Sequence, residues 1–391
     1  MKKMGGGVAA AVVALGATGV LAAVTLSGGE ADAPDARVIT IPSSSSSASA
    51  ASTGTSATVP TTTAAQAYAA AAAAAVPAAT ATSTAKVLPG INISGGEFGG
   101  AGGKLGTNYI YPSTAEMRSY AAQGFKLLRV PFRWERLQPN LYGPLSEVDR
   151  KALKSVVTQA NALGLTVILD MHNYGARQVK GSAALVGSGT LATTALTNAW
   201  VKIMEDYRSN PKVWIGLMNE PNRQTAAQWW AIAGQVTKDI RAQKISNKLL
   251  IPGTAWTGAH NWVSSGNAAQ AVKFVDPGKN YAFEVHQYLD AWSTGTTDKC
   301  EVKAGQRVNA ALTWAEKYKV KLFFGEIAAS GQPQCAKEYP DMLRRLKTSS
   351  AVLGWTAWGG GAWWAYDYMF RLQSRTTTPT AHMKLLLANM P

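Results

Sequence analysis

The stretch Ser146–Asn173, SEVDRKALKSVVTQANALGLTVILDMHN, decides the fold of this chain. Ser146 stands three residues before Asp149, a spacing typical of a helix start, because such side chains satisfy free backbone N–H groups there. Gly164 marks the expected helix end. The apolar run at 165–171 then predicts a buried strand, and polar residues stand where it ends. The stretch therefore predicts a helix followed by a strand that carries polar groups at its carboxyl end.

The same alternation continues in both directions and fills residues 88–391, which we expect to form one catalytic domain. Eight strands are expected, at 90–93, 125–130, 165–171, 213–218, 248–251, 281–286, 320–325 and 351–355. Helices are expected after Ser113 and Ser146 and at 191–207, 225–242, 304–318, 336–347 and 378–389. Strands that alternate with helices favour parallel pairing. The length suits an α/β fold of the (β/α)8 TIM-barrel type with loop insertions, and an open doubly wound sheet is the alternative.

The chain before residue 88 has a different character. Two lysines precede an apolar run at 8–26, which is the pattern of an export signal. An Ala-x-Ala site would make residues 1–33 a cleaved signal peptide, but the run is long enough to span a bilayer as an uncleaved anchor. The Ser-, Thr- and Ala-rich residues 34–87 predict a disordered linker, because they hold too few large apolar side chains to offset ordering. A secreted or periplasmic protein is expected, or else a membrane-anchored one that faces outside.

The charge and the rare residue types exclude several classes of function. Lysine and arginine outnumber aspartate and glutamate by 38 to 23, which gives a formal net charge of +15. These basic residues are scattered along expected helices, which favours a solvated surface over a nucleic-acid partner; an acidic polysaccharide or an envelope surface is the alternative partner. Four histidines without a His-Glu-x-x-His pair, and only two cysteines, argue against zinc. We expect no metal and no cofactor.

The chemistry is expected where the strands end, because TIM barrels carry their active sites at that face. Glu220 and Glu326 follow the fourth and seventh expected strands. Cleavage of a glycosidic bond requires one carboxylic acid and one carboxylate on either side of the bond. Arg129 can hold Glu326 ionised, and that anion then raises the pKa of Glu220. The sequence therefore predicts a carbohydrate-cleaving site.

Six segments in this order resemble glycoside hydrolase family 5, and in particular its endo-β-1,4-glucanases. They are GINISGGEFG at 90–99, DMHNYG at 170–175, NEP at 219–221, VHQYLD at 285–290, FGE at 324–326 and GAWWAYDYMF at 361–370. The resemblance covers nearly the whole expected barrel. It implies retaining, endo-acting hydrolysis of β-1,4-glucosidic bonds in a β-glucan chain, which is the expected partner. We expect the protein to be a monomer. A β-mannanase or xyloglucanase with the same two glutamates is the alternative enzyme, and a non-catalytic carbohydrate-binding envelope protein is the other alternative.

The resemblance also implies a role for each site residue. Glu326 would be the nucleophile, Glu220 the general acid and base, and Asn219 would bond the sugar 2-hydroxyl. Four side chains would support the nucleophile or orient substrate: Arg129, Tyr288, His172 and His286. Three tryptophans would bind sugar rings through their flat faces: Trp358 next to the scissile bond, and Trp256 and Trp262 on the leaving-group side. Packing within the loop is the alternative role for the last two.

Cys300 and Cys335 follow the sixth and seventh expected strands. An exported location favours a disulfide between them, with two free buried thiols as the alternative. A bridge over this separation would contribute about 3–4 kcal/mol in the chain-entropy model. The resemblance implies the same pairing.

Overall fold

The computed structural model describes residues 86–373 and 378–391 of the chain. The expected export segment and all but the last two residues of the expected linker lie outside these ranges. Among the described residues, no helix is both long enough and apolar enough to cross a membrane.

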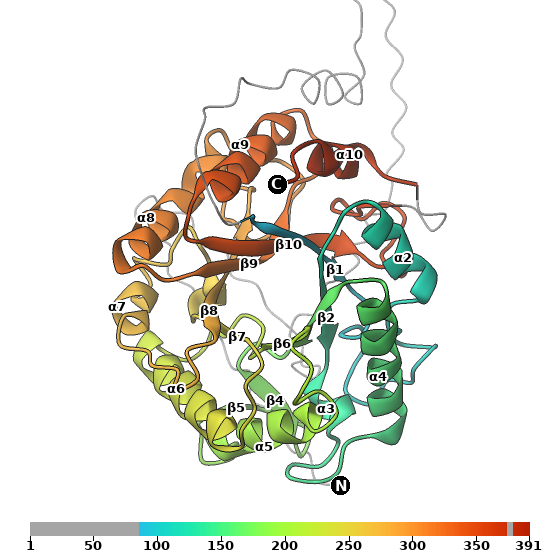
Figure 1. The fold of residues 1–391 in the computed structure, drawn as a ribbon, viewed down its shortest axis with the longest axis vertical. Coiled ribbons are helices and arrows are strands. Elements are labelled where there is room, and N and C mark those ends of the chain that lie inside the picture. Colours follow the sequence, from blue (N-terminus) through green and yellow to red (C-terminus); the bar gives the residue numbers. More distant parts are fainter. Residues whose placement is uncertain (1–85, 374–377) are drawn as a thin grey trace, which may run out of the picture. The chain divides into compact units, whose positions relative to one another are not determined.

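Eight parallel strands close into a barrel, which helices surround (Figure 1). The strands are β1 (Leu88–Ile93), β2 (Leu127–Phe132), β3 (Thr166–Met171), β6 (Val213–Gly216), β7 (Leu249–Pro252), β8 (Tyr281–Tyr288), β9 (Leu322–Ala328) and β10 (Val352–Gly360). Each pairs with its neighbours in the order β1-β10-β9-β8-β7-β6-β3-β2, and β1 pairs with both β2 and β10. The TIM-barrel prediction is confirmed, and the open sheet is excluded.

Helices lie between the strands and cover the outside of the barrel (Figure 1). The α-helices are α2 (Thr114–Ala122), α3 (Trp134–Leu137), α4 (Glu147–Ala162), α5 (Thr193–Met204), α6 (Ala226–Ala242), α7 (Asn267–Ala271), α8 (Asn309–Tyr318), α9 (Cys335–Thr348) and α10 (Ala381–Ala388). Two short 3-10 helices are η1 (Ala255–Thr257) and η2 (Ala304–Val308).

The helix starts follow the local sequence signals. The Ser113 and Ser146 side chains accept hydrogen bonds from the backbone N–H groups of Glu116 and Asp149, so both expected caps are confirmed. Gly164 has φ +82, the left-handed conformation that ends a helix without a Cβ penalty. Short-range signals thus mark these boundaries in the sequence.

Strand β9 contains an irregularity that the sequence did not reveal. Val285 of β8 pairs with Phe324, but the next residue, His286, pairs with Glu326, so β9 holds one extra residue at Gly325. A bulge of this kind bends the strand and re-aims the side chain that follows it. The expected strands ended at 286 and 325, but β8 and β9 continue beyond both positions. His286 and Glu326 therefore lie within strands, not after them.

Two features outside the barrel strands lie in the segments that follow the carboxyl ends of strands. Strands β4 (Ala176–Val179) and β5 (Ser182–Leu185) form an antiparallel hairpin after β3, which is not among the expected strands. Cys300 and Cys335 are joined by a disulfide, as expected, which ties the loop after β8 to the start of α9.

Candidate active site

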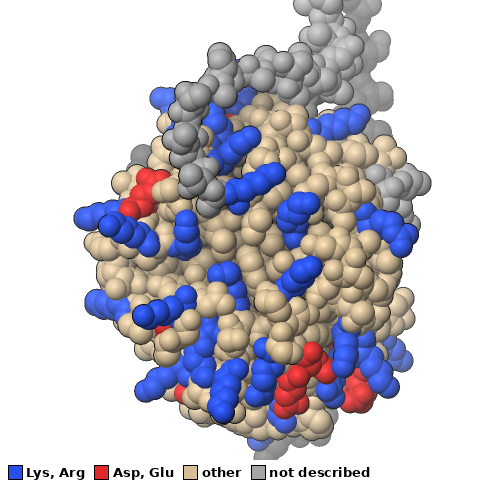
Figure 2. All heavy atoms as spheres, viewed as in Figure 1, with Lys and Arg blue, Asp and Glu red and all other residues tan. Residues whose placement is uncertain are grey.

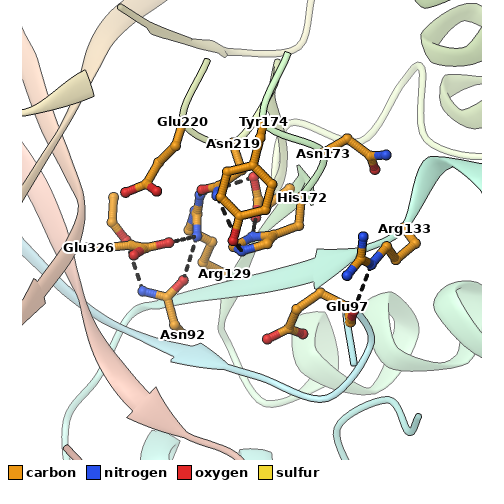
Figure 3. Close-up of polar contacts among 12 residues, drawn as sticks. Asn92, Glu97, Arg129, Arg133, His172, Asn173, Tyr174, Asn219, Glu220 and Glu326 are labelled. Atoms are coloured by element: carbon orange, nitrogen blue, oxygen red, sulfur yellow. Dashed lines mark hydrogen bonds and ion pairs between the residues drawn. The ribbon is translucent and has the colours of Figure 1, made fainter. Parts of the chain in front are cut away.

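The two glutamates reach the mouth of the barrel by different routes. Glu220 lies four residues beyond the end of β6, and its backbone has φ +38. This left-handed conformation is costly for a residue with a side chain and is concentrated at functional sites. Glu326 projects from β9 directly after the bulge at Gly325. Figure 3 shows both carboxylates directed into the same space.

The structure brings these carboxylates close together. Glu220, Glu326 and His286 each place one nitrogen or oxygen atom within 4.8 Å of the others. His286 Nδ1 lies 2.7 Å from Oε1 of Glu220 and 3.6 Å from Oε2 of Glu326. Retaining glycosidases separate their two carboxyl groups by about 5–5.5 Å, whereas inverting enzymes need about 6.5–9.5 Å to admit a water. The spacing here belongs to the shorter class.

Glu326 is held as a carboxylate by its neighbours. Arg129 Nη1 donates to Oε1 of Glu326 at 3.0 Å, and the Tyr288 hydroxyl donates to Oε2 at 2.5 Å. Burial by itself would raise the pKa of Glu326. The charges of His286 and Arg129, together with the hydrogen bond from Tyr288, outweigh burial and hold this pKa below its usual range.

Glu220 has the opposite tendency. Burial raises the pKa of Glu220, and the negative charge of Glu326 raises it further, although the hydrogen bond with His286 opposes both. Burial lowers the pKa of His286, but the charge of Glu326 and the contacts with Glu220 and Glu284 raise it to about 10. A protonated His286 donates from Nδ1 to Oε1 of Glu220, so the other oxygen of Glu220 is the one to carry an acidic proton. The site thus separates one carboxylic acid from one carboxylate.

Arg129 lies at the centre of the site, where it is fully buried among the side-chain oxygens of acidic and amide residues. Its Nη2 lies 3.0 Å from Asp170 and 2.8 Å from the side-chain oxygen of Asn219. Its Nη1 also donates to Asn92 at 2.9 Å, and its Nε lies 3.2 Å from Glu284. A buried guanidinium is tolerated only when nearby anions balance its charge in this way, and here they do so although its Nε has no aligned hydrogen-bond acceptor among the described residues. The network therefore fixes the groups around both glutamates.

Three of these partners had no expected role. Asn92, Asp170 and Glu284 are all fully buried. Glu284 stands two residues before His286 on the same strand, so the two-residue period places both on one face and could have indicated the contact. Asp170 similarly stands two residues before His172, whose Nδ1 lies 2.7 Å from it. No local signal singles out Asn92.

His172 links the centre of the site to the aromatic wall. Its Nε2 lies 3.1 Å from the Tyr174 hydroxyl and 3.2 Å from the side-chain nitrogen of Asn219 (Figure 3). Its ring stacks on Trp358 with centroids 5.7 Å apart and an interplanar angle of 17°. Trp358 also donates from Nε1 to the Tyr368 hydroxyl at 3.0 Å. The indole plane is thereby held rigidly beside the polar centre.

The two tryptophans expected on the leaving-group side have different environments. Trp256 is 58% exposed and lies in η1, where three consecutive residues have positive φ. Its backbone N–H donates to the Pro221 carbonyl, directly after Glu220. Trp262 is 0% exposed. It is enclosed by the aromatic side chains Trp230, Phe283 and Trp314. The expectation that Trp262 binds sugar is therefore wrong, because packing behind the barrel strands removes it from any surface.

Glu97 and Arg133 form a second polar cluster close to His172. Glu97 is buried; its Oε2 accepts from the Gly95 N–H at 2.8 Å, and burial raises its pKa. Arg133 donates from Nε to the Glu97 carbonyl at 2.9 Å, and Figure 3 shows both residues on the same side of His172. Glu97 lies in the 90–99 segment that carries the family resemblance, but its sequence context predicts no role for it.

Among the described residues, Glu220, His286 and Glu326 also form the group with metal-ligand spacing. The chemistry of this set does not favour a cation. His286 Nδ1 is already engaged by Glu220, and Glu326 is already paired with the Arg129 guanidinium.

The comparisons with known proteins agree with this geometry. The model of the family "Cellulase (glycosyl hydrolase family 5)" matches residues 81–362. The chain belongs to glycosyl hydrolase family 5. Endo-beta-1,4-glucanase A of Emericella nidulans is 31% identical, over 73% of this chain and 86% of the relative.

Solved structures of the family superpose closely. XacCel5A, solved in complex with cellopentaose, is 34% identical with a TM-score of 0.74, over 78% of this chain and 99% of that one. The endo-beta-1,4-glucanase Xac0029 from Xanthomonas axonopodis pv. citri is 30% identical with a TM-score of 0.73, over 78% of this chain and 98% of that one.

Proposed function

We propose that this protein is a retaining, endo-acting β-1,4-glucanase in which Glu326 is the nucleophile and Glu220 the general acid and base. The observation that supports this most directly is the close pair of carboxyl groups with opposite pKa directions. The family membership and the endoglucanase relatives support the substrate class. A glucan chain in cellulose or a related β-glucan is the substrate.

The reaction takes two steps. In the first, a carboxylate oxygen of Glu326 attacks the anomeric carbon, while Glu220 gives its proton to the glycosidic oxygen and the leaving chain departs. In the second, Glu220, now a carboxylate, removes a proton from water, which attacks the same carbon and frees Glu326. Two inversions at one carbon return the original configuration.

The surrounding residues hold this geometry. Arg129 and Tyr288 each bond one oxygen of Glu326, so the carboxylate cannot rotate away from the anomeric carbon. Asn219, fixed by Arg129 and His172, is placed to bond the 2-hydroxyl of the reacting sugar. One face of Trp358 stacks on His172 and the residue is 8% exposed, so only its remaining open edge and face can contact that sugar. Exposed Trp256 offers its face to the leaving chain.

Export is the second part of the proposal. The two lysines and the apolar run at 8–26 direct the chain out of the cytoplasm, to a secreted or periplasmic location. A retained apolar run would instead anchor the enzyme to a membrane, facing outside. We propose that the enzyme acts as a monomer.

The test is the release of reducing sugar from carboxymethyl-cellulose, combined with NMR of the first anomer formed. We expect the β-anomer first and a rapid fall in viscosity, as endo cleavage requires. Glu326→Gln should abolish turnover, whereas the exposed Glu205→Gln should not change it. Binding of glucan without any release would identify a carbohydrate-binding protein instead. Faster cleavage of mannan or xyloglucan than of β-glucan would replace the proposed substrate.

A further inference from the structure

The end of the barrel opposite the active site carries a ring of lysines. Six of the eight barrel strands have a lysine within the two residues before their first residue. These lysines are Lys86, Lys126, Lys212, Lys248, Lys279 and Lys321. Residues before parallel strands in a closed barrel all lie at the same end. We call this end, with these six lysines and the nearby Lys244 and Lys319, the lysine face.

Few acidic groups offset this charge. Figure 2 shows Lys and Arg side chains spread over the end of the barrel, with few Asp or Glu among them. Of the acidic residues in the described helix-to-strand connections, Asp276 is buried against Arg241, and Asp206 is engaged by Arg150 and Lys154. Glu205 is the remaining acidic residue of these described connections, and it is exposed.

The lysines are available to a partner. All are exposed except Lys248, which is half-buried and donates to Asn280. Lys126, Lys212 and Lys319 take part in no ion pair among the described residues. Charges left without partners on one face of a strongly basic protein raise its affinity for an anionic surface.

We propose that the lysine face docks on the anionic headgroups of a phospholipid bilayer. The lysines surround one end of the barrel, so many of them can contact a flat anionic bilayer surface at the same time. The chain enters the barrel at this same end, since Lys86 lies two residues before the start of β1. Upstream in the sequence lies the apolar run at 8–26, whose length suffices to span a bilayer. Docking at this end leaves the mouth, with Glu220 and Glu326, turned away from the membrane towards polymeric substrate.

The proposal is independent of the enzymatic activity and is tested with the full chain. Vesicles of phosphatidylcholine with and without phosphatidylglycerol are sedimented with the protein. We expect stronger partitioning onto the anionic vesicles, and loss of this excess when salt rises from about 0.1 M to about 1 M, where the screening length falls from ~10 Å to ~3 Å. Binding through the apolar run alone would be equal on both vesicle types and insensitive to salt.

A matched pair of variants locates the contact. Lys126→Gln, Lys212→Gln and Lys319→Gln together remove three charges from the lysine face. The control removes three exposed lysines from loops at the opposite end: Lys104, Lys180 and Lys303. At about 1 kcal/mol per lysine, roughly fivefold each, the first variant should lose ~100-fold of the partitioning onto anionic vesicles. The control should keep it, and both should keep activity on a soluble glucan.

Three results would overturn the proposal. One is the absence of any excess binding to anionic vesicles. Another is an equal loss in both triple variants, which would reflect net charge and not this face. If the lysine-face variant loses affinity for polygalacturonate while binding to vesicles is unchanged, the partner is an acidic polysaccharide and the membrane proposal fails.

Discussion

The hydroxyl of Tyr288 provides a sharp test of how the site keeps Glu326 ionised. It donates to Oε2 of Glu326 at 2.5 Å within a buried site. Tyr288→Phe removes this donor and keeps the ring, which packs on Phe370 with centroids 5.7 Å apart. The substitution therefore changes the electrostatics of the nucleophile with little change in packing.

The magnitude follows from the contact. A hydrogen bond to a charged group contributes about 1.5–3 kcal/mol, and one pKa unit corresponds to about 1.4 kcal/mol. Loss of the donor should therefore destabilise the carboxylate and raise the pKa of Glu326. The sign is fixed, because the pKa of Glu326 is depressed in the folded enzyme and the nucleophile acts only when ionised. The acidic limb of the activity profile must move to higher pH.

The assay is kcat/KM on a soluble cello-oligosaccharide as a function of pH, which reports the free enzyme. Tyr281→Phe is the control, since Tyr281 begins the same strand at the opposite end of the barrel. The control should leave the acidic limb in place. An unchanged acidic limb in a folded Tyr288→Phe enzyme would refute the electrostatic reasoning, because Tyr288 would then play no part in the ionisation of Glu326.

Two further pairs of substitutions separate packing from chemistry. Trp262→Ala should lower the free energy of unfolding, measured in urea, by about 3–5 kcal/mol. Trp256→Ala should change this free energy by less than ~0.5 kcal/mol and instead raise KM for long oligosaccharides. Equal effects on stability would contradict the buried environment of Trp262 and the exposed environment of Trp256. A Cβ at Gly325 would clash with Oε1 of Glu284, so Gly325→Ala should lower kcat by about 100-fold through displaced catalytic groups. Gly234→Ala in α6 is the control: a Cβ there meets nothing within 4 Å, so the substitution should stabilise the helix by about 0.5–1 kcal/mol. Full activity of the Gly325→Ala enzyme would show that a glycine at the bulge is not required.

Much of the fold could be predicted because it depends on short-range physics. The Ser146 cap, Gly164 and the apolar run at 165–171 act within a few residues of each other, and each element formed where these signals placed it. When strands and helices alternate, a closed parallel barrel covered by helices is one of few arrangements that bury every strand. The barrel could therefore be predicted from the alternation. The β4–β5 hairpin was missed because its four-residue strands carry no strong apolar pattern.

The candidate site was predictable only in part. Polar residues at strand ends pointed to Glu220, Glu326 and Arg129, since chain order and barrel symmetry place such ends on one rim. The burial of Trp262 was not predictable, because an indole suits a sugar platform and an aromatic core equally well. Its neighbours come from three separate segments.

The sequence by itself determined the type and order of the elements, the two acidic groups and the class of chemistry they suit. The tertiary structure decided which atoms meet. The extra residue at Gly325 shifts the register so that Glu326 faces His286, and the Arg129 network joins groups from five strands or their ends. Register and long-range contacts depend on how whole strands pack. A local pattern can therefore name the participants, but only the closed barrel sets their distances and, through those distances, their opposite pKa shifts.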